Sequence, residues 1–303
     1  MAGRTWAIVL AGGEGTRLRG VARDEWGEPA PKQFCRFGAD RTLLDSTLVR
    51  AERIVSRDRI AVSVLEPHRR WWLPGLAGRP AHMTVSQPWS RGTAVGVLAP
   101  LLRIRRDDPG ARIVILPSDH GVADEAILDR SLERAIQAAD RRPDEVVLLG
   151  FAPDSPDTAL GWIVPSGEHD GHTERVAEFV EKPEPREAAR LMASDGMWNG
   201  MLIVASAATL VRLYQRFLPE IIPAAASLAR PRQCESCSRR LESMFRSLPS
   251  RDVSRDLLTP AVGQLRVMRV PSCGWTDLGT PARLLRWQWS QGSPQPTQVA
   301  SSA

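Results

Sequence analysis

The sequence predicts an α/β fold with a Rossmann-like, doubly wound mixed sheet in three αβα layers. Short apolar segments alternate with helical patterns roughly every 25 to 30 residues in the first half of the chain, which is typical of parallel βαβ units. Polar motifs follow several of these segments directly, as at the carboxyl edge of such a sheet. From Gly150 onward shorter strands alternate with turns, so we expect antiparallel neighbours as well.

The expected elements follow from apolar runs and from apolar periodicity. Strands are expected at residues 7–11, 60–65, 83–86, 113–116, 145–149, 161–165, 176–180, 201–204 and 265–270. Helices are expected at 43–55, from 93 onward, and at 123–140, 184–194, 207–217 and 281–289, with 220–260 mainly helical but interrupted by prolines. We therefore predict one catalytic domain over residues 1–289 and a disordered Ser/Pro/Gln-rich tail over 290–303.

The first strand breaks into a glycine-rich loop. Gly12, Gly13 and Gly15 allow positive φ and a close backbone approach to a ligand, and successive N–H groups in such a turn form an anion-binding nest. Leu18 stands where a dinucleotide fingerprint needs glycine, and the Gly-Lys-Ser/Thr of a P-loop is absent. Taken alone, the loop fits a tight turn as well as a phosphate site.

Two further polar motifs follow expected strands. Gln87 ends one of them, and the next helix opens at Thr93, where free N–H groups would face a ligand. Asp119 follows the strand at 113–116; taken alone it also fits a helix cap. Since carboxyl ends of parallel strands share one edge, the glycine loop, Gln87 and Asp119 are expected to converge on one site.

Composition excludes several classes of protein. The net charge of +5 comes from basic residues interleaved with acidic ones, without a basic block, which favours small anionic ligands over nucleic acid. Only two of the 40 basic residues are lysines, Lys32 and Lys182, which suggests positions where a compact point charge is needed.

No run of apolar residues is long enough to span a membrane, and no secretory signal pattern is present. The four cysteines lack the spacing of a disulfide framework, which predicts a reducing, cytoplasmic location. Cys234 and Cys237 lack a second ligand pair, so we expect no zinc site there.

With these motifs in hand, the sequence resembles the sugar-phosphate nucleotidyltransferases, and among them the mannose-1-phosphate guanylyltransferases. The matching segments lie in the family's order and cover residues 5 to 285: 10–18, 31–34, 87–94, 116–120, 161–163, 179–183, 198–200 and 274–279. The resemblance implies a GT-A-like nucleotide-diphospho-sugar transferase fold. It also implies transfer of a nucleotidyl group from a nucleoside triphosphate to a sugar 1-phosphate, with release of pyrophosphate.

The resemblance further assigns residues to roles. Its catalytic cations are Arg17, Lys32 and Lys182, and its Mg²⁺ ligands are Asp119 and Asp277. The expected nucleotide-binding residues are Leu10, Ala11, Gly12, Gly13, Gly15, Thr16, Arg17, Gln87, Gly92, Thr93 and Ser118. The expected sugar-phosphate-binding residues are Gly161, Glu181, Lys182 and Asn199, and His120 is expected to be structural.

Three departures from the family pattern leave the substrates open. Trp162 stands where many relatives have tyrosine, and no serine follows Asn199 closely. Gln87 replaces a glutamate that would accept from two guanine donors, and a glutamine also suits uracil or thymine. GTP with mannose 1-phosphate, giving GDP-mannose, is therefore the first expectation, and UTP, dTTP, ATP or CTP with another sugar 1-phosphate is the alternative.

A catalytically silent nucleotide-sugar sensor is a second alternative, from another functional class. The sequence leaves a homodimer open. Because the chain ends soon after the last motif, no fused second activity is expected.

Overall fold

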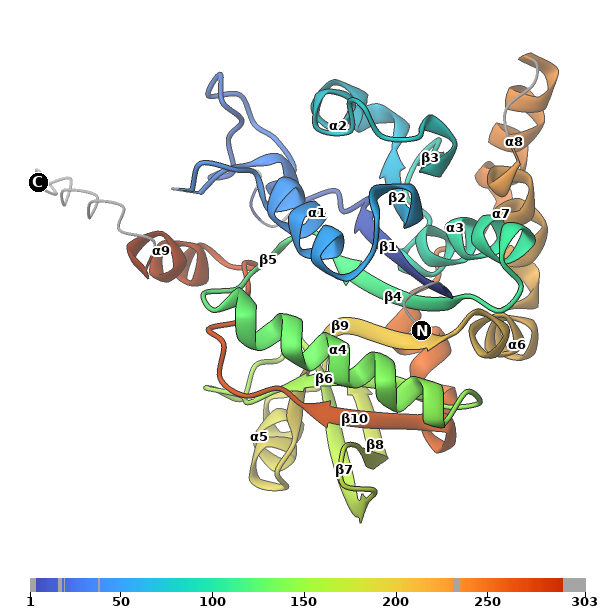
Figure 1. Ribbon diagram of the computed structural model, residues 1–303. Coiled ribbons are helices and arrows are strands. Elements are labelled where there is room, and N and C mark those ends of the chain that lie inside the picture. The colour runs from blue at the N-terminus through green and yellow to red at the C-terminus, as the bar shows by residue number, and fades with distance from the viewer. Residues whose placement is uncertain (1–3, 16–17, 19, 38, 231–234, 291–303) are drawn as a thin grey trace, which may run out of the picture.

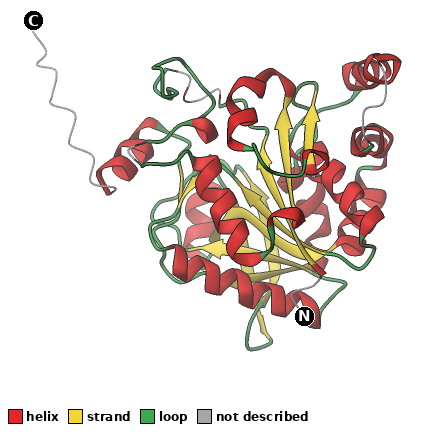
Figure 2. Cartoon of the chain, turned by 45° about the horizontal axis from the view of Figure 1, so that its top comes forward, coloured by secondary structure: helices red, strands yellow, loops and turns green. Residues whose placement is uncertain are grey.

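A mixed β-sheet between two layers of helices forms the body of the protein, as Figures 1 and 2 show. The computed structural model describes residues 4–15, 18, 20–37, 39–230 and 235–290. Within them nine strands form one sheet in the order β3-β2-β1-β4-β9-β6-β10-β8-β7. The strands are β1 (Thr5–Ala11), β2 (Ile60–Leu65), β3 (Thr84–Gln87), β4 (Arg112–Pro117), β6 (Val146–Phe151), β7 (Gly161–His169), β8 (Glu174–Glu181), β9 (Met197–Ser206) and β10 (Leu265–Arg269).

The helices lie close to their predicted positions, except for α2, which was not predicted. They are α1 (Leu43–Ile54), α2 (Arg69–Gly75), α3 (Thr93–Asp107), α4 (Glu125–Arg141), α5 (Pro185–Ala193), α6 (Ala207–Phe217), α7 (Ile222–Ala229), α8 (Glu235–Ser247) and α9 (Pro281–Ser290). Two shorter helices border the site: the 3₁₀ turn η3 (Lys32–Phe34) and the π-helix η8 (Val253–Leu258).

The sheet is parallel at one end and antiparallel at the other. β1 pairs in parallel with β2 and β4, and β2 pairs in parallel with β3. β9 runs antiparallel between β4 and β6, and its first residues also pair with β7. It begins at Met197 rather than at the predicted residue 201, because Trp198 and Asn199 take part in both pairings.

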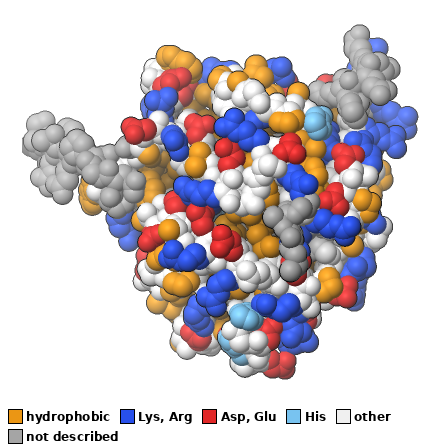
Figure 3. All heavy atoms as spheres, viewed as in Figure 1, with side chains coloured by type: hydrophobic (Ala, Val, Ile, Leu, Met, Phe, Trp, Pro, Cys, Tyr) orange, Lys and Arg blue, Asp and Glu red, His pale blue; other side chains and the backbone are white. Residues whose placement is uncertain are grey.

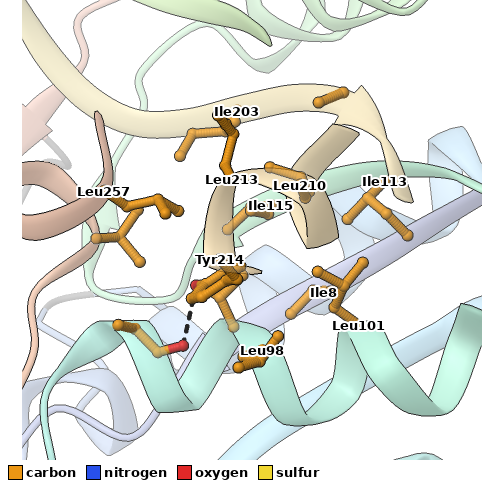
Figure 4. Packing of buried hydrophobic residues seen from close by; sticks show 14 of the residues in the cluster. Ile8, Leu98, Leu101, Ile113, Ile115, Ile203, Leu210, Leu213, Tyr214 and Leu257 are labelled. Atoms are coloured by element: carbon orange, nitrogen blue, oxygen red, sulfur yellow. Dashed lines mark hydrogen bonds between the residues drawn. The ribbon is translucent and has the colours of Figure 1, made fainter. Parts of the chain in front are cut away.

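Helices cover both faces of the sheet, and the side chains of β1 show why. Ala7, Val9 and Ala11 pack into a core under α1 and α4, whereas Ile8 points into the opposite core under α3, α6 and α7. Figure 4 shows the second core, in which the Tyr214 hydroxyl donates to the Ala94 carbonyl over 2.9 Å. A strand buried on both faces needs apolar residues at successive positions, which explains the unbroken apolar runs of the sequence.

A small second sheet forms beside the first and was not predicted. β5 (His120–Gly121) and β11 (Thr276–Asp277) pair antiparallel, with Asp277 opposite His120. This pairing places the segment 274–279 beside the residues that follow β4. It therefore places two aspartates from distant parts of the sequence next to each other.

Charged side chains of both signs lie on the surface. On the face viewed in Figure 3, basic and acidic side chains are interspersed, without a continuous basic patch. None of the helices in the described ranges combines the length and the apolar character needed to cross a bilayer.

Candidate active site

Lys32 lies between two carboxylates that are far apart in the sequence. Its Nζ is 3.1 Å from Asp119 Oδ2 and 3.1 Å from Asp277 Oδ1. Burial by itself would lower the pKa of Lys32, but the two carboxylates outweigh this effect and raise it. Lys32 is therefore a fixed cation, held where β4 and β11 end.

Asp119 is not a helix cap. Helix α4 is capped by Asp124, whose carboxylate accepts from the Ile127 N–H over 3.1 Å. Burial would raise the pKa of Asp119, but the Lys32 ammonium holds it below its usual value, so the carboxylate is ionised. This excludes the cap interpretation that the sequence had left open.

His120 has the structural role expected for it. Its Nδ1 accepts from Trp275 Nε1 over 3.3 Å, and the two rings meet edge to face. Burial lowers the pKa of His120, which favours the neutral ring that this hydrogen bond requires.

Gln33 supports the glycine-rich loop, a role that the sequence did not suggest. Its Nε2 donates to the carbonyls of Ala11 (3.2 Å) and Gly13 (2.7 Å), so it binds the loop through two backbone oxygens. Gly15 has a φ of +63°, and a Cβ there would lie 3.0 Å from the Pro31 backbone. The loop and the segment before Lys32 are thus in direct contact, whereas Thr16 and Arg17 lie outside the described residues.

Ser118 joins the ends of β1 and β4. Its hydroxyl donates to the Leu10 carbonyl over 2.7 Å, and its backbone N–H donates to the same oxygen. Ser118 therefore fixes the start of the loop relative to Asp119.

Gln87 is buried beside the glycine-rich loop. Its Nε2 donates to Ser63 Oγ over 3.3 Å, and a Cβ on Gly12 would lie 3.6 Å from the same nitrogen. Its Oε1 has no hydrogen-bond partner among the described residues, although it is buried. A buried acceptor without a partner is costly, and a ligand N–H at this position would satisfy it.

The start of α3 differs from expectation, because its N–H groups are not all free. The Ala94 N–H donates to the Arg251 carbonyl over 3.0 Å, and the Thr93 hydroxyl accepts from the Val253 N–H. Gly92 has a φ of +82°, and a Cβ there would collide with the Arg251 carbonyl oxygen. The glycine is thus required by the close approach of residue 251, whatever else it contacts.

Three residues predicted to bind the sugar phosphate form one row across three strands. Gly161 on β7 pairs with Glu181 on β8 and with Asn199 on β9. A Cβ on Gly161 would lie 2.6 Å from Glu181 Oε2, so a side chain at this position would push the carboxylate out of its place. Burial raises the pKa of Glu181, and the nearby Asp252 raises it further.

Ser254, in the π-helix η8, contacts two residues of this row, a role that the sequence did not indicate. Asn199 Nδ2 donates to its hydroxyl over 3.2 Å, and the hydroxyl also hydrogen-bonds to Glu181. Asp252, which caps η8, accepts from the Thr93 hydroxyl over 3.0 Å. The π-helix therefore connects the residues predicted to bind the nucleotide with those predicted to bind the sugar.

Lys182 comes directly after Glu181 in the sequence, and its backbone conformation is unusual. Its φ is +52°, uncommon for a residue with a side chain, and its N–H donates to the Leu160 carbonyl. Its Nζ is 3.3 Å from Glu181 Oε1, and the side chain is 52% exposed. The second lysine is thus a solvent-accessible cation at the edge of the row.

Arg283, from α9, is a buried cation next to Asp277 and was also missed. It lies 3.8 Å from Asp277 Oδ2 and 2.6 Å from Asp157 Oδ2, and its guanidinium covers the Trp198 ring at 5.0 Å. Arg283 links the aspartate pair to the strand that carries Asn199. Arginine is so frequent in this chain that nothing in the sequence singles this residue out.

Trp162 does not face the sugar row. It is fully buried in the core under α5, and its Nε1 donates to the Asp157 carbonyl over 2.8 Å. Cys234 lies outside the described residues, as does the side chain of Cys237.

The aspartate pair fits a divalent cation. One oxygen of each carboxylate approaches the Lys32 ammonium, so the two converge on a single cation position, and a Mg²⁺ bound by both would take the place of that ammonium. One or two carboxylates, with phosphate oxygens and water, are the donor set that Mg²⁺ prefers.

An α/β sheet with these groups at one edge is the scaffold of an enzyme class that handles phosphorylated ligands. The chain belongs to the nucleotidyl transferase family, whose model matches residues 6–290. This confirms the family resemblance and the fold predicted from the sequence.

Named relatives agree with the family. The chain is 28% identical over 283 residues to the xanthan biosynthesis protein XanB of Xanthomonas campestris pv. campestris, covering 92% of this chain and 58% of XanB. It is 27% identical to the mannose-1-phosphate guanylyltransferase ManC of Salmonella typhimurium, covering 96% of this chain and 61% of ManC. The chain thus spans less than two thirds of these relatives.

A solved structure, described as a mannose-1-phosphate geranyltransferase from Thermus thermophilus, superposes with a TM-score of 0.79 at 29% identity. The match covers 94% of this chain and 79% of that one.

Proposed function

We propose that this chain transfers a nucleotidyl group from a nucleoside triphosphate to a sugar 1-phosphate, giving a nucleotide sugar and pyrophosphate. GTP and mannose 1-phosphate are the substrates we favour. The observation that carries the proposal is the convergence of Lys32, Asp119 and Asp277 at the edge where the glycine-rich loop begins. With Mg²⁺ bound by the two aspartates, the metal and Lys32 would neutralise phosphate charge, as such a transfer requires. The family supports the same reaction.

In this reaction a phosphate oxygen of the sugar 1-phosphate attacks the α-phosphorus, and pyrophosphate leaves. Both substrates are anions and repel each other, so cations must offset this repulsion. Backbone N–H groups of residues 12–16, with Arg17, would bind the triphosphate, and Lys32 would stabilise charge near the transferred group. Lys182 would bind the phosphate group of the sugar 1-phosphate. Glu181 would accept hydrogen bonds from the sugar hydroxyl groups, and Asn199 would donate to them.

Mg²⁺ would be held by Asp119 and Asp277, and when bound it neutralises phosphate charge. Arg283 lies on the other side of Asp277, in ion pairs with Asp277 at 3.8 Å and with Asp157 at 2.6 Å. Gln33 holds two loop carbonyls, so that the N–H groups of the loop stay free for phosphate oxygens.

The choice of base rests on Gln87. Its unpartnered Oε1 offers an acceptor to a base N–H next to Gly12. Guanine has such donors at N1 and N2, and uracil or thymine has one at N3. The names of the relatives favour guanine, so GTP is the first choice. We further propose a cytoplasmic location, supported by the buried free thiols of Cys35 and Cys273.

A pyrophosphate-release assay tests the proposal. Five nucleoside triphosphates are each combined with mannose 1-phosphate and glucose 1-phosphate in the presence of Mg²⁺. Fastest turnover with GTP and mannose 1-phosphate is expected. Turnover with UTP and glucose 1-phosphate but none with GTP would overturn the choice of substrates, and nucleotide binding without release for every pair would support the sensor.

A further inference from the structure

A cavity of about 530 Å³ lies at the open edge of the sheet, beside β3. Its walls come from α2, β3, α3 and the end of α7, and no residue of the candidate active site lines it. Its volume lies within the range of small-molecule sites.

The wall of the cavity carries four arginines, Arg69, Arg79, Arg103 and Arg230, and one carboxylate, that of Glu66. Arg69 is paired with Glu66 over 3.3 Å. The Arg103 guanidinium donates only to backbone carbonyls, among them those of Ala229 (2.9 Å) and Leu228 (3.2 Å). None of the ion pairs among the described residues includes Arg103, and Asp107 acts on it only through its charge at longer range.

Arg79 adds an unsatisfied donor. One nitrogen of its guanidinium is paired with Glu52, whereas Nη1 is buried and has no hydrogen-bond partner among the described residues. The side chain is only 9% exposed. Because a buried donor without an acceptor is costly, this wall is suited to an anionic ligand.

The cavity also has apolar lining residues. Trp72, Leu73, Leu76 and Leu228 line it, and the Trp72 indole N–H is already used by the Leu65 carbonyl at 2.8 Å. The cavity thus offers ring and aliphatic surface a short way from guanidinium groups. This combination suits a molecule with a flat or apolar body and one anionic group.

The cavity also contacts the strand that carries Gln87. Thr84 and Ser86 of β3 line it, while the alternate residues Val85 and Gln87 are buried on the opposite face of that strand. β3 is a short edge strand that pairs only with β2. A ligand that shifts β3 would therefore shift Gln87 as well.

We propose that this cavity is a second ligand site, for a small organic anion with an apolar or flat body, and that its occupant acts on the nucleotide pocket through β3. The second part rests on the proposed function, whereas binding in the cavity does not.

Titration calorimetry of the full chain with phenyl phosphate tests the binding. Phenyl phosphate is expected to bind at one site, more tightly than inorganic phosphate or phenol alone. With excess GTP and Mg²⁺ present, phenyl phosphate should still bind saturably, its affinity changed by the same factor by which it changes the affinity for GTP. Competitive displacement that grows with the GTP concentration would place the probe at the nucleotide-binding residues and overturn the proposal. Absence of saturable binding at millimolar phenyl phosphate would overturn it as well.

Two variants assign the binding to the cavity. Arg230→Ala removes one exposed guanidinium and is expected to weaken binding about tenfold or more, the usual scale for a charged hydrogen bond. Leu73→Asp adds a repelling carboxylate at an exposed position and is expected to abolish binding. Arg134→Ala, an exposed arginine on α4, is the matched control. Equal affinity in all three variants would contradict the site.

The coupling is tested by the affinity for GTP and UTP with and without saturating phenyl phosphate. A change of about fivefold or more is expected for the nucleotide that binds. Unchanged affinity would overturn the coupling through β3. Failure of both nucleotides to bind would instead contradict the proposed function, so the two failures are distinguishable.

Discussion

Asp277→Asn is the sharpest test of the aspartate pair. The substitution keeps the shape of the side chain but removes its charge. Lys32 would retain Asp119 at 3.1 Å, and Arg283 would retain Asp157 at 2.6 Å, so neither buried cation loses its last carboxylate. We therefore expect a loss of about 1–2 kcal/mol in the free energy of unfolding, rather than the ~3–5 kcal/mol that follows when a buried charge is left unpaired.

The effect on activity is expected to be larger. Losing one of two anionic metal ligands costs about 3 kcal/mol or more of transition-state stabilisation, on the order of a hundredfold in rate. Pyrophosphate release is measured over a range of Mg²⁺ concentrations, and urea unfolding is measured on the same preparation.

The matched control is Asp129→Asn, because Asp129 is another partly buried carboxylate, 3.3 Å from Arg53 and remote from the site. The control is expected to keep its turnover. The reasoning is refuted if Asp277→Asn retains activity within about threefold of the parent at every Mg²⁺ concentration.

Three further predictions concern the sugar row and the stability of the sheet. Lys182→Ala should raise KM for the sugar 1-phosphate about tenfold and leave KM for the triphosphate unchanged; equal effects on both would contradict its role. Gly161→Ala should lower kcat/KM for the sugar 1-phosphate in a folded protein, since its methyl group would lie 2.6 Å from Glu181 Oε2; unaltered steady-state kinetics would argue against the row. Burial alone would raise the pKa of Asp170, but hydrogen bonds from backbone N–H groups and from Arg142 lower it, so its stabilisation is present above pH 3.8 and is lost as the pH falls further. Asp170→Asn should therefore cost about 1–3 kcal/mol at pH 7 and progressively less in acid, as urea unfolding at several pH values would show.

The fold was largely predictable because its signals are local. Helix α6 was predicted at its observed residues, and β2 likewise, since an apolar run or a 3.6-residue period reports directly on burial. β5 and β11 could not be predicted, because a strand of two residues has no periodicity. The cap of α4 was ambiguous as well, until Asp124 was seen to accept from Ile127.

The candidate site was predictable in its motifs but not in its contacts. The rarity of lysine drew attention to Lys32 and Lys182, and the resemblance supplied the two aspartates. Gln33, Arg283 and Ser254 went unnoticed, because each acts through partners remote from it in the sequence. Their residue types alone gave no chemical signal.

The sequence by itself determined most of the strands and helices, the glycine-rich loop and the residues available for chemistry, because each is a local pattern. Only the tertiary structure decided that Lys32 lies between Asp119 and Asp277, that Gln33 binds the loop through two backbone oxygens, and that Gly161 faces Glu181 and Asn199. The physical reason is that periodicity reports which side of an element is buried. It does not report which distant element will cover that side, and this is fixed only when the strands pair and the helices pack upon them.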